Sequence, residues 1–181
     1  MVYMFSGPDR TGKTTQIKNL KKYLEEKGEL AHVLHYSNIK GNNIRERSEE
    51  YYKQMFKLIK CATNNQINLI FDRCHDGEAV YGPIYRDYSG DFVYEIESAF
   101  GNKILQNIIL FVFIDNPERL IGREDGESFT VELEKKKNEI NKFIEFHDQS
   151  KIKNKKLINI VEYSPEQVFE EMKNYLEGKY V

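Results

Sequence analysis

The stretch SGPDRTGKTTQ, residues 6–16, follows the apolar run VYMF (2–5) and leads into a segment with helical periodicity. Between Gly7 and Thr14 it carries the pattern G-x-x-x-x-G-K-T, in the strand–loop–helix context that this pattern requires. Glycines let the backbone curl, so that successive N–H groups point inward at the positive end of the following helix. The stretch therefore predicts a loop that binds the phosphates of a nucleoside triphosphate.

The side chains of this loop have separate predicted roles. Lys13 adds a mobile positive charge for the β- and γ-phosphates, and the Thr14 hydroxyl is a ligand for Mg²⁺. The residues expected to bind ATP here are Gly7, Arg10, Thr11, Gly12, Lys13, Thr14 and Thr15. The alternative is a glycine-rich turn that matches by chance, which the agreement of motif and context disfavours.

A second signal is the stretch LIFDR (69–73), in which an apolar run ends in Asp72 and Arg73. Ligands of open α/β sheets bind at the carboxyl ends of the strands, which is where Asp72 would lie. We expect Asp72 to hold the Mg²⁺ shell through water and Arg73 to bind a second phosphate group through its fork of donors. The alternative for Asp72 is a cap on the next helix.

Apolar runs alternate with helical segments along the chain. The predicted strands are 2–5, 31–36, 67–71, 107–114 and 156–161, and the predicted helices are 11–27, 44–62, 131–149 and one beginning at Pro165. Alternation of this kind predicts an α/β fold with a doubly wound, five-stranded parallel sheet and helices on both faces. We expect one domain spanning residues 1–181.

Composition narrows the class of protein. The chain has 181 residues and a net charge of -2, which argues against a nucleic-acid partner, since such proteins need surplus basic charge. The basic run KIKNKK (151–156) reads as a solvated turn. Cys61 and Cys74 have no disulfide or metal spacing, and no apolar stretch reaches the roughly 18 residues of a membrane span. We expect a reduced, cytoplasmic protein that does not contact membranes.

The stretch GPDRTGKTTQ (7–16) resembles the phosphate loop of thymidylate kinases, in which an acid stands two residues after the first glycine. The arginine that follows resembles the subgroup that supplies a catalytic arginine from this loop. The resemblance implies a P-loop kinase fold. It also implies that Asp9 faces the sugar 3′-hydroxyl of the nucleotide being phosphorylated, and that Arg10 touches the γ-phosphate of ATP.

Two further stretches carry the resemblance. DRCHDGEAVYG (72–82) is similar to the family pattern D-R-Y-x-x-S-x-x-A-Y-Q, which places Tyr81 near the base or sugar. FVFIDNPERL (111–120) resembles the fourth strand of the family and leads into IGREDGESF (121–129), which is typical of a lid at about 117–130. In that lid Arg123 is expected to clamp phosphate and Arg119 to bind ATP; the alternative is an arginine pair solvated on a surface helix.

The sequence departs from the family where the base is bound. Gly77 replaces a serine, Gly82 replaces the glutamine near the pyrimidine, and Cys74 replaces an aromatic residue. The arginine-bearing motif of the substrate helix has no clean match, and Arg45, Arg47, Tyr51, Tyr52 and Tyr36 are the nearest stand-ins. The acceptor site is expected to contain Asp9, Tyr36, Arg45, Tyr51, Arg73, Gly77, Tyr81 and Arg86. Two glycines would leave room for an altered pyrimidine.

The resemblance implies ATP-dependent phosphorylation of a pyrimidine deoxynucleoside monophosphate, namely dTMP, dUMP or a 5-substituted dUMP, with Mg²⁺ bound to ATP. The expected catalytic residues are Lys13, Arg10, Arg73 and Arg123, with Thr14 and Asp72 on the metal. The sequence is most similar to thymidylate kinase-like proteins of bacteriophages, which implies a phage protein in the host cytoplasm, and the family implies a homodimer.

Two alternatives to this function stay open. One is a kinase of the same fold that acts on a hydroxyl of a deoxynucleoside or of base-modified DNA. A hydroxyl acceptor needs a carboxylate base, and Asp9 or Glu78 could serve. The other is a nucleotide switch without enzymatic activity, which would require a water-positioning residue and a segment that reorders on hydrolysis.

Overall fold

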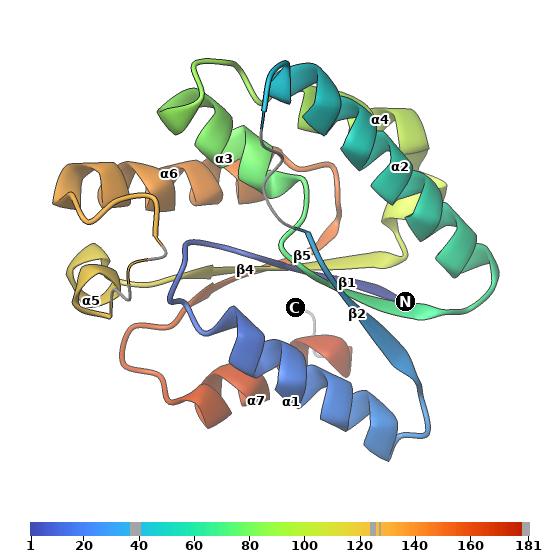
Figure 1. Ribbon diagram of the computed structural model, residues 1–181. Coiled ribbons are helices and arrows are strands. Elements are labelled where there is room, and N and C mark those ends of the chain that lie inside the picture. Colours follow the sequence, from blue (N-terminus) through green and yellow to red (C-terminus); the bar gives the residue numbers. More distant parts are fainter. Residues whose placement is uncertain (37–40, 124–125, 127, 179–181) are drawn as a thin grey trace.

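The computed structural model describes residues 1–36, 41–123, 126 and 128–178. At its centre lies an all-parallel sheet of five strands in the order β2-β3-β1-β4-β5 (Figure 1). The strands are β1 (Val2–Ser6), β2 (Ala31–His35), β3 (Asn68–Asp72), β4 (Ile108–Ile114) and β5 (Asn154–Asn159). Each predicted strand is present, with ends shifted by one or two residues.

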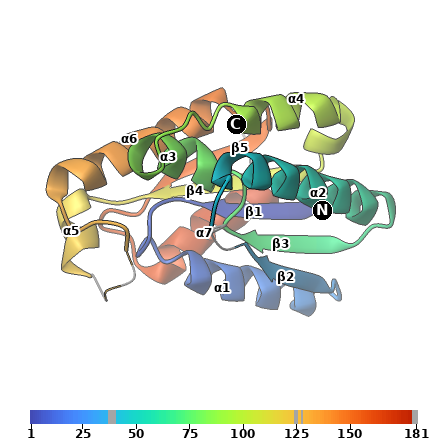
Figure 2. The ribbon, with the colours of Figure 1, turned by 45° about the horizontal axis from the view of Figure 1, so that its top comes forward.

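Helices cover both faces of the sheet. Helices α1 (Lys13–Glu26) and α7 (Pro165–Leu176) pack on one face, and α2 (Ile44–Asn64), α3 (Asp76–Tyr85), α4 (Phe92–Leu105) and α6 (Leu133–Gln149) lie over the other (Figures 1 and 2). The short helix α5 (Pro117–Gly122) follows the carboxyl end of β4. The prediction of a doubly wound α/β fold is confirmed.

The central strands are largely apolar because both of their faces are buried. Side chains alternate across a strand, so Val2 and Met4 of β1 join the core under α2, α3, α4 and α6, whereas Tyr3 and Phe5 join the core under α1 and α7. The central strands β1, β3 and β4 therefore read as continuous apolar runs. Strand β2 lies at the edge of the sheet and exposes His32, Val33 and His35.

Two helix ends follow the predicted signals. Helix α1 ends before Gly28, whose φ of 77° and N–H bond to the Glu25 carbonyl close the last turn. Helix α7 begins with a capping box, in which Ser164 accepts a hydrogen bond from the Gln167 N–H and Gln167 accepts one from the Ser164 N–H. Pro165 occupies the first turn, where its missing N–H is not needed.

Helices α3 and α4 were not predicted from the sequence. Helix α3 contains Pro83, and α4 is broken at Gly101, where φ is 69° and ψ is 169°. Both features interrupt the helical pattern in the sequence.

The prediction of a solvated turn at 151–156 is wrong for its second half, because residues 154–156 are part of β5. Lys155 Nζ donates to the carbonyl oxygens of His147, Asp148 and Ser150, which lie at the end of α6.

None of the helices in the described part of the chain combines the length and apolarity that crossing a bilayer requires.

Candidate active site

The phosphate loop connects β1 to α1, and its glycines are required by its geometry. Gly7 has a φ of 129°, and a Cβ there would lie 2.2 Å from the carbonyl oxygen of Phe113 on β4. Gly12 is the N-cap of α1 with a φ of 75°. A side chain at Gly7 would push the loop away from the sheet, and one at Gly12 would strain the backbone that opens the helix.

Lys13 lies folded against its own loop. Its Nζ donates to the carbonyl oxygens of Gly7 and Pro8 at 2.7 Å each, and the residue is only 6% exposed. Burial lowers the pKa of Lys13 to about 8, while the nearby Asp9 carboxylate acts in the opposite direction. The expectation of a mobile charge is therefore wrong for this conformation, in which the two loop carbonyls hold the ammonium group.

A cavity of about 310 Å³ lies beside Lys13 at the carboxyl edge of the sheet. It is lined by Asp9, Arg10, Gly12, Lys13, Thr14, His35, Asp72 and Arg73. All of these residues except His35 were predicted from the sequence. Two residues predicted to bind ATP, Thr11 and Thr15, do not line this cavity. Thr11 is buried and donates to the Pro8 carbonyl, whereas Thr15 is exposed on α1. The fold thus gathers the phosphate loop and the end of β3 around one hollow.

His35 reaches this cavity from the edge strand. Parallel pairing of β2 with β3 places His35 opposite Asp72, and His35 Nδ1 lies 3.1 Å from Asp72 Oδ2. The alternative of Asp72 as a helix cap is wrong, since α3 begins four residues later with His75 as its N-cap. The only sequence signal for His35 was its place at the end of the second predicted strand.

Asp9 and Arg73, both expected on the acceptor side, contact each other. Arg73 Nη2 donates to Asp9 Oδ1 at 2.5 Å. Arg73 has a φ of 66°, and its N–H donates to the carbonyl of Phe5 on β1. Arg73 lines both the phosphate cavity and a second, more enclosed cavity.

That second cavity is small, and four of its nine lining residues are aromatic. It is lined by Gly7, Tyr36, Tyr52, Arg73, Cys74, Asp76, Gly77, Tyr81 and Phe143. Tyr36 packs against Tyr51 and Tyr52 at ring-centroid distances of 4.9 and 6.4 Å. Burial raises the pKa of Tyr81, and the neighbouring Asp9 carboxylate adds to the shift. The volume of this cavity is only about 10 Å³, the space of about one water molecule, so a flat ring would enter only if these aromatic side chains moved apart.

Asp76 fixes the start of α3 under the phosphate loop. Its carboxylate accepts hydrogen bonds from Ser6 Oγ at 2.6 Å and from the Cys74 N–H at 3.1 Å, and the residue is 3% exposed. Because Ser6 directly precedes Gly7, this contact ties the start of α3 to the phosphate loop. No motif in the sequence pointed to Asp76.

The two glycines of α3 have different surroundings. A Cβ on Gly77 would meet only Tyr81 Cδ2, at 3.8 Å, and Gly77 lines the enclosed cavity. A Cβ on Gly82 would lie 3.0 Å from the Tyr88 ring and 3.1 Å from the Tyr88 carbonyl oxygen. The interpretation that Gly82 leaves room for the base is wrong, because Tyr88 occupies that space.

Three predicted acceptor residues line neither cavity: Arg45, Tyr51 and Arg86. Arg86 donates to Glu78 Oε1 at 2.6 Å, and the Tyr88 hydroxyl donates to the same carboxylate. Arg45 lies 3.6 Å from Glu49 and over the Phe92 ring, between α2 and α4. Glu78 is buried in this cluster, which removes it as a candidate base and leaves Asp9.

The lid arginines are held at the end of β4. Arg123 Nη1 donates to Asp115 Oδ2 at 2.9 Å and to the carbonyl oxygen of Arg10 at 3.2 Å. Arg119 Nη1 lies 3.5 Å from Asp115 Oδ1. The alternative of a solvated arginine pair is wrong, because both guanidinium groups share a buried carboxylate. Of the predicted lid, residues 124, 125 and 127 lie outside the described part of the chain.

Beyond those residues the segment predicted as a lid packs on α3. Phe129 stacks on Tyr81 with ring centroids 4.8 Å apart and on Tyr85 at 5.1 Å. Tyr85 donates to Glu139 of α6 at 2.5 Å. The segment after the arginines therefore packs on Tyr81, a residue that lines the second cavity.

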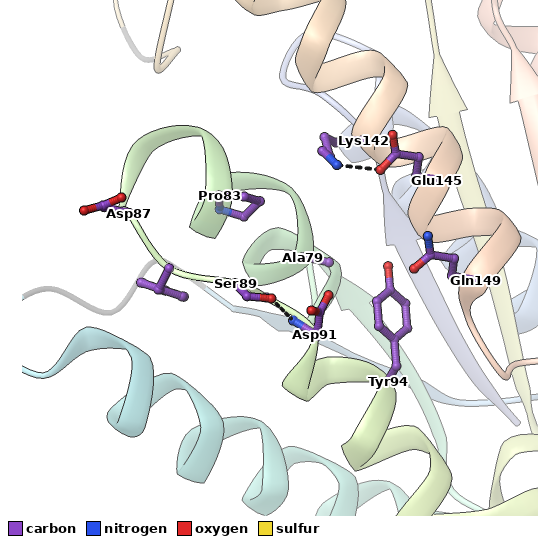
Figure 3. Close-up of a pocket in the computed structure, with 11 residues that line it drawn as sticks. Ala79, Pro83, Asp87, Ser89, Asp91, Tyr94, Lys142, Glu145 and Gln149 are labelled. Atoms are coloured by element: carbon purple, nitrogen blue, oxygen red, sulfur yellow. Dashed lines mark hydrogen bonds and ion pairs between the residues drawn. The ribbon is translucent and has the colours of Figure 1, made fainter.

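A further cavity of about 460 Å³ lies between α3, the connection to α4, and α6. Figure 3 shows Glu145 and Gln149 of α6 beside Tyr94 of α4, with Pro83 on α3. It contains none of the predicted site residues.

No model of a known protein family matches the chain, and no curated protein matches it. Many solved structures are similar to the chain, and two of them match over nearly their whole length. The first is the YorR protein of Bacillus subtilis in complex with phosphorylated GDP, with a TM-score of 0.68, 17% identity, and 99% of this chain and 98% of that chain covered. The chain has the fold of P-loop kinases. The second is thymidylate kinase from Candida albicans, with a TM-score of 0.62, 13% identity, and 98% and 91% covered.

Proposed function

We propose that the protein transfers the γ-phosphoryl group of ATP to the 5′-phosphate of a deoxynucleoside monophosphate. The observation that carries the proposal is the position of Arg73, which lines both the cavity at the phosphate loop and the enclosed aromatic cavity. A cation that lines both cavities lies where the phosphate of an acceptor would meet the phosphate of the donor. Similarity to the thymidylate kinase of Candida albicans supports the same reaction.

A phosphate acceptor fits the side chains better than a hydroxyl does. The second pKa of a phosphate monoester is about 6, so the acceptor is already mostly dianionic near neutrality and needs no base. The remaining candidate base, Asp9, is paired with Arg73 rather than placed alone. Positioning and neutralisation of charge then supply the catalysis, through Lys13, Arg10 and Arg123 on the transferred group and Arg73 on the acceptor.

The donor set fits Mg²⁺ bound to a nucleotide. The Thr14 hydroxyl and the Asp72 carboxylate line the same cavity, and such sites commonly use one or two protein oxygens together with substrate phosphates. Within the described ranges, no cluster of three His, Cys, Asp or Glu side chains could form a metal cage by itself. When bound, Mg²⁺ would neutralise phosphate charge.

For the acceptor base we propose a pyrimidine: dTMP, dUMP or a 5-substituted dUMP. Support comes from Gly77, which adds no side chain beside Tyr81, so that the small cavity would admit a base when the aromatic side chains around it move apart. One methyl group in an apolar pocket changes the free energy of binding by only about 1–3 kcal/mol, so discrimination at position 5 should be weak. The segment at about 117–130 would act as the lid that excludes water.

The test is a comparison of kcat/KM with ATP and Mg²⁺ for dTMP, dUMP, 5-hydroxymethyl-dUMP, dGMP and thymidine. We expect dTMP and dUMP to agree within about tenfold, and dGMP and thymidine to be refused. The complex of YorR with phosphorylated GDP makes dGMP the informative purine. Ready use of dGMP would contradict the pyrimidine proposal, and use of thymidine would show a hydroxyl kinase. Hydrolysis of ATP without transfer to any acceptor would favour a nucleotide switch.

A further inference from the structure

Asp115 is a buried carboxylate at the end of β4 that no predicted role explains. The residue is 3% exposed, and its side chain is fully covered. We infer that Asp115 is a positioning residue, which holds the guanidinium of Arg123 against the phosphate loop for the transferred phosphoryl group. The inference rests on the proposed function, because it assigns a partner to one of its cations.

The contacts of Arg123 carry the inference. Its Nη1 reaches two oxygens at once: Oδ2 of Asp115 and the main-chain carbonyl of Arg10 in the phosphate loop. Arg123 follows the last residue of α5, so the helix alone does not fix the end of its long side chain. The side chain of Arg123 is 42% exposed, whereas that of Asp115 is fully covered. Asp115 is thus fixed in the core, and the Arg123 guanidinium lies at the phosphate loop.

The charges point to an anionic ligand. A buried carboxylate must be paired, and one arginine would neutralise it. Asp115 has two, since Arg119 also approaches it at 3.5 Å. Its Oδ1 additionally accepts the N–H of Asn116 at 2.8 Å. The group of three side chains therefore carries one surplus positive charge, next to a loop whose N–H groups bind anions.

A purely structural ion pair would hold α5 on the sheet and do nothing else. Arg119 provides the comparison, because it contacts the same carboxylate from inside α5, four residues along the chain. The contact with the phosphate loop is made by Arg123. If Asp115 only fastens α5, the losses caused by changing Asp115 and Arg123 should be independent of each other in kcat.

The first experiment is a double-mutant cycle in kcat and in KM for ATP. Asp115→Asn keeps the shape and an oxygen for the Asn116 N–H but removes the charge. We expect kcat to fall roughly 10- to 100-fold while KM for ATP changes less than about threefold, as for a contact that strengthens in the transition state. Adding Arg123→Ala should cause little further loss in kcat. Adding Arg119→Ala should multiply the losses, because Arg119 is not the cation being positioned.

The second measurement is chemical rescue, which keeps Asp115 intact and does not depend on how well Asp115→Asn folds. In the Arg123→Ala variant, guanidinium chloride at millimolar concentration should restore kcat at least tenfold and saturably, because Asp115 and the Arg10 carbonyl remain to bind it. Methylammonium at equal ionic strength is the control and should restore much less.

The inference is overturned if guanidinium gives no rescue, if Asp115→Asn keeps the wild-type kcat or raises it, or if the losses from Asp115→Asn and Arg123→Ala multiply. These results are distinct from a failure of the proposed function, in which the wild-type protein itself would phosphorylate no nucleoside monophosphate.

Discussion

Lys13 shows how burial and charge conflict at a single residue. Its ammonium is almost fully covered and is stabilised by two main-chain carbonyls. The pattern G-K-T predicted its presence at the loop but not its direction, because the sequence does not show that the loop carbonyls of Gly7 and Pro8 lie within its reach. Phosphate oxygens would offer the ammonium a stronger partner than these neutral carbonyls.

The lowered pKa of Lys13 predicts a pH dependence of stability in protein free of nucleotide and metal. Burial lowers the pKa to about 8 from 10.5, so between these values the unfolded chain binds more protons and the free energy of unfolding rises with pH. The gain in the free energy of unfolding that comes from Lys13 should reach about 3 kcal/mol at pH 10.5. Denaturant titrations of wild type and Lys13→Met, from pH 7 to pH 10.5, should show that the free energy of unfolding of the wild type rises relative to that of the variant. A constant difference between the two would contradict this account of Lys13.

Arg10 allows its side chain and its backbone to be tested separately. Its φ is 71°, a conformation that glycine adopts without strain and alanine does not. We expect Arg10→Gly and Arg10→Ala both to lower kcat far more than they raise KM for ATP, since the guanidinium acts as charge develops in the transition state. Steady-state kinetics of the pair would give the answer. A rise in KM alone, or a loss in Arg10→Ala that Arg10→Gly does not share, would show that the side chain is not catalytic.

At the scale of elements, α3 carries the sharpest prediction about packing. Gly77→Ala adds a methyl group in ordinary contact with Tyr81, whereas Gly82→Ala places one 3.0–3.1 Å from Tyr88. We expect Gly77→Ala to keep or raise the melting temperature, because alanine favours a helix by up to about 1 kcal/mol, and to raise KM for the acceptor. Gly82→Ala should lower the melting temperature, because overpacking costs about 1–3 kcal/mol, and should leave KM near wild type. The reverse pattern would restore Gly82 to the base pocket.

The sequence predicted the elements that have simple periodicity and failed where local signals conflict. Strands β1, β3 and β4 are apolar on both faces. Gly28 marks the C-terminal end of α1, and Ser164 is the N-cap of α7. Helix α3 has Pro83 inside it, and α4 is kinked at Gly101, so neither was predicted. Motif spacing located Asp72 and Lys13. The pairing of His35 with Asp72, and of Asp115 with Arg123, depends on strand register and side-chain reach, which no local pattern contains.

At the scale of the whole molecule, the strand order assembles the site. Strand β1 lies between β3 and β4, so the phosphate loop that follows β1 is flanked by Asp72 at the end of β3 and by Asp115 after the end of β4. Arg123 contacts this loop through the Arg10 carbonyl, and the loop's Gly7 also lines the second cavity, where we propose that the acceptor binds. Residues more than one hundred positions apart in the chain, such as Arg10 and Arg123, meet at one edge of the sheet.

The most direct test of the central claim is to identify the phosphorylated product. Purified protein is incubated with ATP, Mg²⁺ and dUMP or dTMP, and the phosphorus NMR spectrum is followed, with Lys13→Ala as the control. We predict that the acceptor monoester signal is replaced by the paired α and β signals of a nucleoside diphosphate, in equal amount to the ADP formed. Lys13→Ala should form neither product. An unchanged acceptor signal while ATP is hydrolysed to ADP and free phosphate, or transfer by Lys13→Ala at the wild-type rate, would contradict the account.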